Sequence, residues 1–190
     1  DEFSYEEEKF SIQIGPNQFS ENHLFLDLEA ENLRMQGEIS FHNNQRFPVS
    51  LFSPGIMGWY ALVPFMECYH GVVSMQHTLS GNLTINGSTI TYKGGTGYIE
   101  HDWGRSMPSD WIWMQSNHFD QDGEASFMLS VARIPWLRGY FPGFLSFLLV
   151  DKTLYRFATY NNSKVSSLRE TEDRVEVVLS NKKHTLEVGA

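Results

Sequence analysis

Three carboxylates stand where charged residues are otherwise scarce or where strand alternation would bring them together. Glu67 is the only charged residue between Phe47 and Tyr92. Glu100 and Asp102 alternate within the segment GYIEHDWGR, so an extended strand would point both to one side. Loss of hydration raises the pKa of a carboxyl group and keeps it neutral, as a general acid must be. The pattern predicts catalytic carboxylates at Glu67, Glu100 and Asp102.

Each of these carboxylates also has a simpler interpretation. Glu67 would then close a strand end by pairing with an arginine or a backbone amide. Asp102 would form a salt bridge with the nearby Arg105, which would keep the carboxylate ionised and make its role structural. The sequence leaves both interpretations open.

Aromatic and amide side chains near these acids favour an amphiphilic ligand. In strand alternation Trp111 and Trp113 share a face with Gln115 and Asn117. That face is apolar at one end and hydrogen-bonding at the other, which suits a ligand with an apolar tail and a polar head. The residues predicted to bind the ligand are Trp59, Tyr69, His70, Trp103, Trp111, Trp113, Gln115, Asn117 and His118. A tryptophan-rich core with amides at its end is the alternative.

Other kinds of site find little support in the sequence. The seven histidines match no metal-ligand spacing such as HExxH, so no metal site is predicted. The segment Gly94-Gly95-Thr96-Gly97 lacks the lysine of a phosphate-binding loop, and no cofactor is expected. The single cysteine, Cys68, excludes a disulfide framework and carries no nucleophile signature, so a buried inert thiol is predicted.

Charge and hydropathy limit the kinds of partner that the chain is expected to bind. The chain has 14 Lys and Arg against 23 Asp and Glu, and its net charge of −9 argues against a nucleic-acid partner. No apolar run approaches the roughly 18 residues of a membrane-spanning helix, so no transmembrane segment is predicted. A small amphiphilic ligand and a cytoplasmic location are expected, and a peripheral contact with a membrane is left open.

The elements that would position these residues are predicted to be strands. Apolar and polar residues alternate over 10–14, 25–29 and 35–41, as in half-buried strands. Asn86-Gly87 lies between alternating β-formers and predicts a type I′ hairpin turn, and Asp151-Lys152 predicts a second hairpin. No capped amphipathic helix longer than two turns is evident. The fold class is therefore all-β, with antiparallel strands in a barrel or sandwich.

Composition also varies along the chain. Because residues 47–92 are almost free of charge, this stretch is predicted to be buried core or the wall of an apolar cavity. The glycine-rich break at 93–97 predicts a boundary near residue 95. The chain is expected to form two β regions, 1–95 and 96–190, or one continuous domain.

Several runs of residues resemble a known family. MGWYALVPFMECYHGVVSM, GYIEHDWGRSMP, WIWMQSNHF, SFMLSVARIP and GFLSFLLVDKTLYRFATY follow one another within residues 47–160. In this order they resemble the tocopherol cyclase family and its bacterial relatives. The resemblance implies a lipocalin-like β-barrel in two parts, with 1–95 and 96–190 as parts of two successive barrels. It also implies a distant similarity to hydratases that add water to carotenoid double bonds.

The sequence departs from that family in two places. Upstream aromatic motifs of the kind YFEGWYFK, which members carry, are absent, so the chain is expected to be a portion of a longer protein. In the family's EKxWG pattern, His101 occupies the position of the lysine.

The activity that the resemblance implies is that of an intramolecular lyase, an isomerase that closes a prenylated quinol to a chromanol without a cofactor. Alkene protonation needs a neutral carboxylic acid in a dry site, and the resulting cation is stabilised by aromatic faces. Asp102 is the preferred acid, because it is short and precedes Trp103-Gly104, where a turn would present it to a cavity.

The other residues take supporting roles in this interpretation. Cation stabilisation is expected from Trp103, Trp111 and Trp113, and quinol binding from Gln115, Asn117 and His118. Two alternatives remain: a lipocalin-like carrier that binds an apolar or isoprenoid ligand without converting it, and an interaction domain without a pocket. A carrier has no use for a desolvated carboxyl group beside the ligand tail, which separates it from a cyclase.

Overall fold

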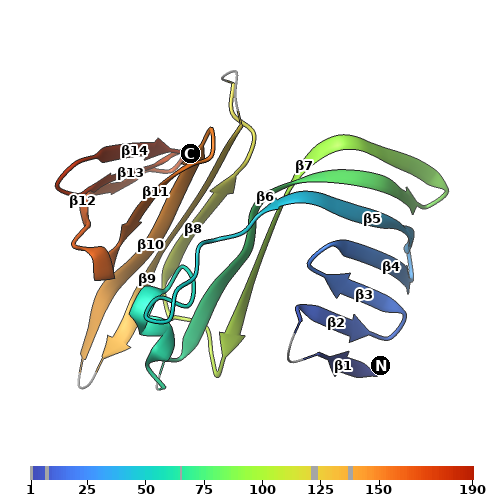
Figure 1. Cartoon of the computed structure of the whole chain (residues 1–190), viewed down its shortest axis with the longest axis horizontal. Helices are drawn as coiled ribbons and strands as arrows, with labels where there is room; N and C mark the ends of the chain where they lie inside the picture. Colours follow the sequence, from blue (N-terminus) through green and yellow to red (C-terminus); the bar gives the residue numbers. More distant parts are fainter. Residues whose placement is uncertain (1, 7–8, 65, 121–123, 137–138) are drawn as a thin grey trace. The chain divides into compact units, whose positions relative to one another are not determined.

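The computed structural model describes residues 2–6, 9–64, 66–120, 124–136 and 139–190, and these residues form an all-β chain (Figure 1). The strands are β1 (Phe3–Tyr5), β2 (Ser11–Ile14), β3 (Asn17–Ser20), β4 (His23–Ala30), β5 (Leu33–Gln45), β6 (Cys68–Ile85), β7 (Ser88–Gly104), β8 (Trp111–Ser116), β9 (Ala125–Trp136), β10 (Gly139–Val150), β11 (Thr153–Ala158), β12 (Lys164–Glu170), β13 (Val175–Ser180) and β14 (Thr185–Gly189). Two short 3₁₀ helices are present, η1 (Gly58–Leu62) and η2 (Thr159–Asn161). The predicted all-β class is confirmed, and the described residues contain no helix that is long and apolar enough to cross a membrane.

The strands form three open antiparallel sheets, and within each sheet the strands lie side by side in the order of the sequence. The sheets consist of β1–β7, β8–β11 and β12–β14 (Figure 1). None of them closes into a barrel within the described ranges. The chain groups into two compact units: unit 1 comprises residues 1–46 and 73–99, and unit 2 comprises residues 47–72 and 100–190. The boundary expected near residue 95 stays a prediction.

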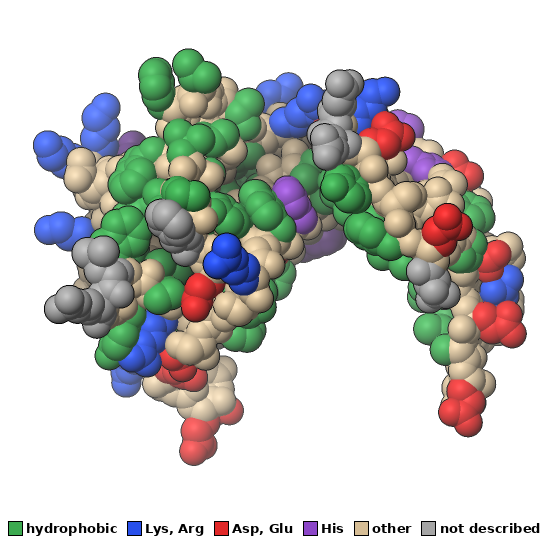
Figure 2. Space-filling model, turned by 90° about the horizontal axis from the view of Figure 1, so that it is seen from below, with side chains coloured by type: hydrophobic (Ala, Val, Ile, Leu, Met, Phe, Trp, Pro, Cys, Tyr) green, Lys and Arg blue, Asp and Glu red, His purple; other side chains and the backbone are tan. Residues whose placement is uncertain are grey.

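The sheet of unit 1 is amphipathic, as the alternation in its sequence predicts. Ile12 pairs with Phe19, Phe19 with Leu24, and Leu24 with Ile39, so one apolar row crosses four strands on one face. Gln13 pairs with Gln18 on the other face. Figure 2 shows charged side chains of this unit on one side of the sheet and hydrophobic ones on the other. The predicted strands at 10–14, 25–29 and 35–41 are therefore confirmed.

Two predicted hairpin turns are confirmed by their backbone angles. Asn86 (φ 48°) and Gly87 (φ 83°) connect β6 to β7, and Asp151 (φ 45°) and Lys152 (φ 66°) connect β10 to β11. Positive φ at both central residues defines the turn whose twist matches that of the flanking strands. These turns fix the register of the strands that carry Glu100, Asp102 and the β10 residues discussed below.

Unit 2 contains a sandwich in which sheet β8–β11 packs against sheet β12–β14. Their shared core consists of Phe127, Leu129, Phe144, Phe157, Val177 and Leu179, all buried. The core residues come from β9, β10 and β11 on one side and from β13 on the other. One face of sheet β8–β11 is therefore filled by hydrophobic packing, which leaves its opposite face available for a cavity.

The charge-poor stretch 47–92 is only partly buried. Phe47 and Ile56 are buried as predicted, and the Phe47 ring packs 6.0 Å from that of Phe147. The prediction is wrong for Leu51, which is exposed, whereas Val49 and Phe52 are exposed but line a second cavity of unit 2. These three belong to a surface turn rather than to a strand, so the lack of charge there does not reflect core packing.

A buried histidine in unit 1 makes folding stability sensitive to acid. His77 is 3% exposed, lies against the Phe41 ring, and has Nδ1 3.0 Å from the Ser74 hydroxyl. Burial lowers its pKa from 6.5 to about 4. Because the unfolded chain binds a proton that the folded chain does not, stability present above pH 6.5 falls between pH 6.5 and 4, by about 3 kcal/mol.

We expect this loss to disappear when His77 no longer titrates. Urea unfolding of the wild type and of His77→Gln at pH 7 and pH 4.5 measures it, because carboxylates elsewhere contribute equally to both proteins. The wild-type advantage should be larger at pH 7 than at pH 4.5. The same advantage at both pH values would contradict a neutral buried His77.

Candidate functional site

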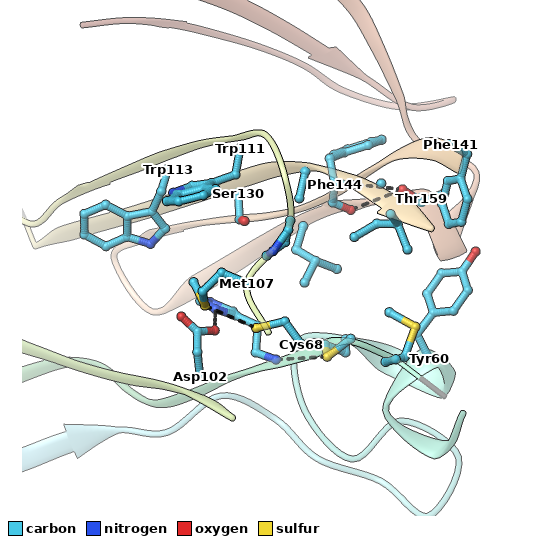
Figure 3. A pocket seen from close by; sticks show the side chains of 18 of the residues that line it. Tyr60, Cys68, Asp102, Met107, Trp111, Trp113, Ser130, Phe141, Phe144 and Thr159 are labelled. Carbon is cyan, nitrogen blue, oxygen red and sulfur yellow. Dashed lines mark hydrogen bonds and ion pairs between the residues drawn. The ribbon is translucent and has the colours of Figure 1, made fainter. Parts of the chain in front are cut away.

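A cavity of 310 Å³ lies within unit 2, between the open face of sheet β8–β11 and a second wall from β6, β7 and η1 (Figure 3). Trp111, Trp113 and Ser130 lie on one side, and Cys68 and Asp102 lie on the other (Figure 3). The lining is mostly hydrophobic, with few polar groups. A cavity of this size and lining fits a small apolar or amphiphilic molecule.

The cavity exists because large and small residues alternate across the sheet. Trp111 pairs with Ala132, and Ala132 pairs with Gly143. This row across three strands therefore holds one large indole, one methyl group and one glycine, which has no side chain. In the next row Trp113 pairs with Ser130. Cross-strand partners share a face, so the small residues leave open space beside the two indoles. The predicted common face of Trp111 and Trp113 is confirmed, and this face lines the cavity.

The polar wall is built where the beginning of β6 lies beside the end of β7. The backbone N–H of Arg105 donates to the carbonyl oxygen of Glu67 at 2.8 Å. Gly104 has φ +152°, and a Cβ there would collide with the backbone of Glu67 and Cys68. This close approach brings Cys68 and His70 next to the carboxylates of β7.

His70 lies between the two carboxylates of the GYIEHDWGR segment. Its Nδ1 is 2.6 Å from Oδ1 of Asp102, and its Nε2 is 3.4 Å from Oε2 of Glu100. The side chains of His70, Glu100 and Asp102 are 11%, 19% and 35% exposed. The predicted common side of Glu100 and Asp102 is confirmed, and both line the cavity. The ion pair of Asp102 in the described part of the chain is with His70, not with Arg105.

The two contacts of His70 differ in quality. The Asp102 contact has the length of a strong charge-assisted hydrogen bond. At 3.4 Å the Glu100 contact is within ion-pairing distance, but the buried Nε2 makes no hydrogen bond of good geometry with any described residue. Glu100 therefore interacts with Nε2 through its charge.

Within this cluster, the two carboxylates favour the protonated form of His70. Burial lowers its pKa, but the negative charges of Glu100 and Asp102, together with the Asp102 hydrogen bond, outweigh burial, so the pKa is raised above 6.5. The pKa of the neighbouring His101 is lowered, first by burial and then by the charge of His70. The site thus combines one imidazolium with two carboxylates. Among the described residues, no group of three or more His, Cys, Asp or Glu is arranged to hold a metal ion.

Sulfur atoms line the same wall as the carboxylates. The Cys68 thiol lies 3.8 Å from Sδ of Met107, and Sδ of Met57 accepts a hydrogen bond from the His70 backbone N–H at 3.1 Å. Burial, followed by the charge of Asp102, raises the pKa of Cys68, which keeps the thiol protonated. The wall is therefore polarisable and apolar around the charged cluster.

Several residues predicted to bind a ligand lie outside this cavity. Tyr69 and Trp103 stack with ring centroids 5.4 Å apart, Trp103 also stacks on His101 at 4.6 Å, and His101 and Trp103 cover Gly71. This stack lies on the face of β6 and β7 opposite His70 and Asp102.

The remaining predicted residues are distributed elsewhere. Trp59, in η1, stacks on Tyr60 and lines a different cavity. Glu67 bonds to β7 through its backbone, and Gln115, Asn117 and His118 do not line the 310 Å³ cavity. The cavity thus brings together five of the predicted residues, namely His70, Glu100, Asp102, Trp111 and Trp113.

Other lining residues were not predicted from the sequence. They include Met57, Tyr60, Ser130, Ala132 and Phe141. Ser130 and Ala132 leave a recognisable signal, since small residues alternate there within an otherwise hydrophobic strand. Met57 and Tyr60 precede β6 in an irregular segment, where no periodicity indicates their orientation.

The raised pKa of His70 predicts a stability contribution with a defined pH range. A protonated His70 held by two carboxylates stabilises the folded state fully below pH 6.5, and this contribution is lost as the pH rises through the raised folded pKa. We expect the unfolding free energy of the wild type to exceed that of His70→Gln most at about pH 6. An NMR titration of the imidazole Cε1 proton provides the direct readout. A difference that grows above neutral pH would contradict this assignment.

The chain was also compared with known protein families, curated proteins and solved structures. Residues 38–189 match the family described as tocopherol cyclase-like. No curated protein and no solved structure matches the chain. The matched segment includes both strands of the charged wall and the β8 indoles opposite them. Because the match extends over most of its 190 residues, the chain belongs to the tocopherol cyclase-like family.

Proposed function

We propose that this protein cyclises a prenylated quinol, protonating a tail alkene so that the phenolic oxygen can close the ring. The observation that carries the proposal is the Glu100–His70–Asp102 cluster on one wall of an apolar cavity whose opposite wall holds two indoles. Such a cavity offers a proton source at one side and an apolar lining for the isoprenoid tail at the other.

Asp102 is the proposed proton donor. In the reactive state Asp102 is protonated. Its proton moves to one alkene carbon, and a tertiary cation forms on the other. The carboxylate left behind is stabilised by the His70 imidazolium, whose Nδ1 is 2.6 Å away. When the phenolic oxygen attacks the cation it loses its proton, which returns to Asp102. The product is an isomer of the substrate, so no oxidant, reductant or cofactor enters the balance.

The contact with His70 favours Asp102 over Glu100 as this donor. Oδ1 of Asp102 lies 2.6 Å from Nδ1 of His70, whereas Oε2 of Glu100 lies 3.4 Å from Nε2, so the carboxylate left by proton transfer is better stabilised at Asp102. Glu100 would offset the positive charge at Nε2 of the imidazolium and hold the ring in place. In this assignment Asp102 is catalytic, and His70 and Glu100 are positioning residues.

The indoles of Trp111 and Trp113 are the proposed stabilisers of the cation. Each aromatic face contributes about 0.5–2 kcal/mol to a nearby cation, with the larger value in a desolvated site. The tail must fold over the ring for closure, and orientation within the cavity would supply much of the rate. Trp103 has no part in this proposal, because it stacks on the opposite face of β7.

The alternative function is a carrier that binds an apolar or isoprenoid ligand without converting it. The predominantly apolar lining suits either function. The clustered carboxylates favour catalysis, because their desolvation costs stability that a carrier would have no reason to retain. Binding and turnover separate the two functions experimentally.

The first test replaces the proposed donor with its neutral isostere. Asp102→Asn should reduce turnover of a prenylquinol by about 10²–10⁴-fold while binding of the same compound persists. Product is measured by chromatography and binding by quenching of tryptophan fluorescence. Unchanged turnover would remove Asp102 from the mechanism. Binding without turnover in the wild type would favour the carrier.

The second test fills the cavity without touching a charged group. Ala132→Leu adds bulk between Trp111 and Gly143, so binding of the prenylquinol should fall at least tenfold, since a side chain then occupies the space of the tail. Circular dichroism checks the fold. Full-strength binding by a folded Ala132→Leu protein would place the ligand elsewhere.

A further inference from the structure

A second cavity of unit 2 lies beside the most exposed hydrophobic side chains of the described chain. Its volume is 290 Å³, and its lining includes Val49, Phe52, Trp59 and Arg156. Leu51, Phe52 and Val49 are 83%, 78% and 72% exposed, the highest fractions among the large hydrophobic residues of the described ranges. Exposed hydrophobic side chains grouped on one turn mark an interaction site rather than random surface.

The backbone of this turn is satisfied by its own hydrogen bonds. The N–H of Ser50 donates to the carbonyl oxygen of Ser53 at 2.9 Å, and the N–H of Ser53 donates to that of Ser50 at 3.1 Å. Leu51 and Phe52 therefore stand at the tip of a closed two-residue loop. A tip with these bonds made internally can leave water at lower cost, because fewer backbone groups lose hydrogen bonds.

Arg156 supplies the only charge among the residues that line this cavity. Its guanidinium lies 5.9 Å from the ring of Phe47, and none of the ion pairs between described residues includes it. The hydroxyl of Tyr160 donates to the Ile56 carbonyl oxygen at 2.6 Å, which anchors the preceding segment to η2. A guanidinium beside an apolar tip fits a phosphate group joined to hydrocarbon.

We propose that the turn 50–53 and Arg156 dock this protein onto the surface of an anionic phospholipid bilayer. Leu51 and Phe52 enter the interfacial region, Val49 follows at its edge, and Arg156 binds a lipid phosphate. The net charge of −9 means that an anionic surface repels the chain as a whole, so attachment depends on this local site. The inference does not rest on the proposed cyclisation, because its residues do not line the 310 Å³ cavity.

A bilayer suits this surface better than a protein groove or a soluble anion. The apolar side chains protrude on a narrow turn, whereas protein interfaces bury a broader patch with a packed centre. A soluble phosphate would use Arg156 but leave Leu51 and Phe52 without a role. A bilayer uses both the charge and the protruding side chains.

The test is flotation of the full chain with vesicles of phosphatidylcholine, with or without phosphatidylglycerol. The wild type should float with the mixed vesicles. Leu51→Ser combined with Phe52→Ser should weaken binding about tenfold or more, since two apolar side chains are lost from the interface. Arg156→Gln should weaken binding to the mixed vesicles by about fivefold and change binding to phosphatidylcholine little.

Leu168→Ser provides the matched control. Leu168 is 42% exposed on β12 and does not line the 290 Å³ cavity, so its replacement should leave flotation unchanged. A Phe52→Trp variant should show blue-shifted emission and quenching by brominated lipids. Failure of the wild type to float on either vesicle, or equal flotation of the Leu51/Phe52 double variant, would overturn the proposal. Binding of inorganic phosphate without flotation would assign Arg156 to a soluble anion instead.

Discussion

The charged wall of the cavity depends on one ion pair, between His70 of β6 and Asp102 of β7. Strand alternation places Glu100 and Asp102 on the same face, where two carboxylates beside an apolar cavity would repel each other. The imidazolium between them offsets that repulsion and supplies a hydrogen bond of 2.6 Å to one of them. Burial, followed by the same positive charge, lowers the pKa of His101, so His70 is the one histidine of the cluster whose pKa is raised.

The opposite wall depends on packing rather than on charge. Sheet β8–β11 has one face filled by the core it shares with β13, and its other face is hollow. The hollow follows from Ala132 and Gly143, which stand in line with Trp111. The filled face would keep the sheet rigid, so the absence of bulk on the other face need not lead to collapse. One face of sheet β8–β11 thus packs in the sandwich, and the opposite face forms a wall of the cavity.

Much of this arrangement could be predicted from the sequence, because it follows from a period of two residues. Alternation predicts the strands, the common side of Glu100 and Asp102, and the common side of Trp111 and Trp113. It could not predict that His70 meets Asp102, 32 residues away, because that contact depends on the register of the β6–β7 hairpin.

The predicted ligand-binding residues that lie outside the cavity are explained by their own local packing. Tyr69 and Trp103 belong to the right strands but to the opposite face, where they stack with each other. The high content of aromatic residues predicts a ligand site. Stacking of rings on neighbouring strands accounts for the same side chains without a ligand. Trp59 belongs to η1, where strand alternation does not apply.

Among the described residues, the strands of each sheet pair in the order of the sequence. This topology affects the order in which the chain folds. Contacts of this kind are local, so each hairpin can form before the next is complete. The β6–β7 hairpin would close from the Asn86-Gly87 turn, and His70 and Asp102 lie near its open end. The two residues would therefore meet only after the rest of the hairpin has formed. During synthesis and refolding, the acidic centre would be among the last parts of this hairpin to assemble.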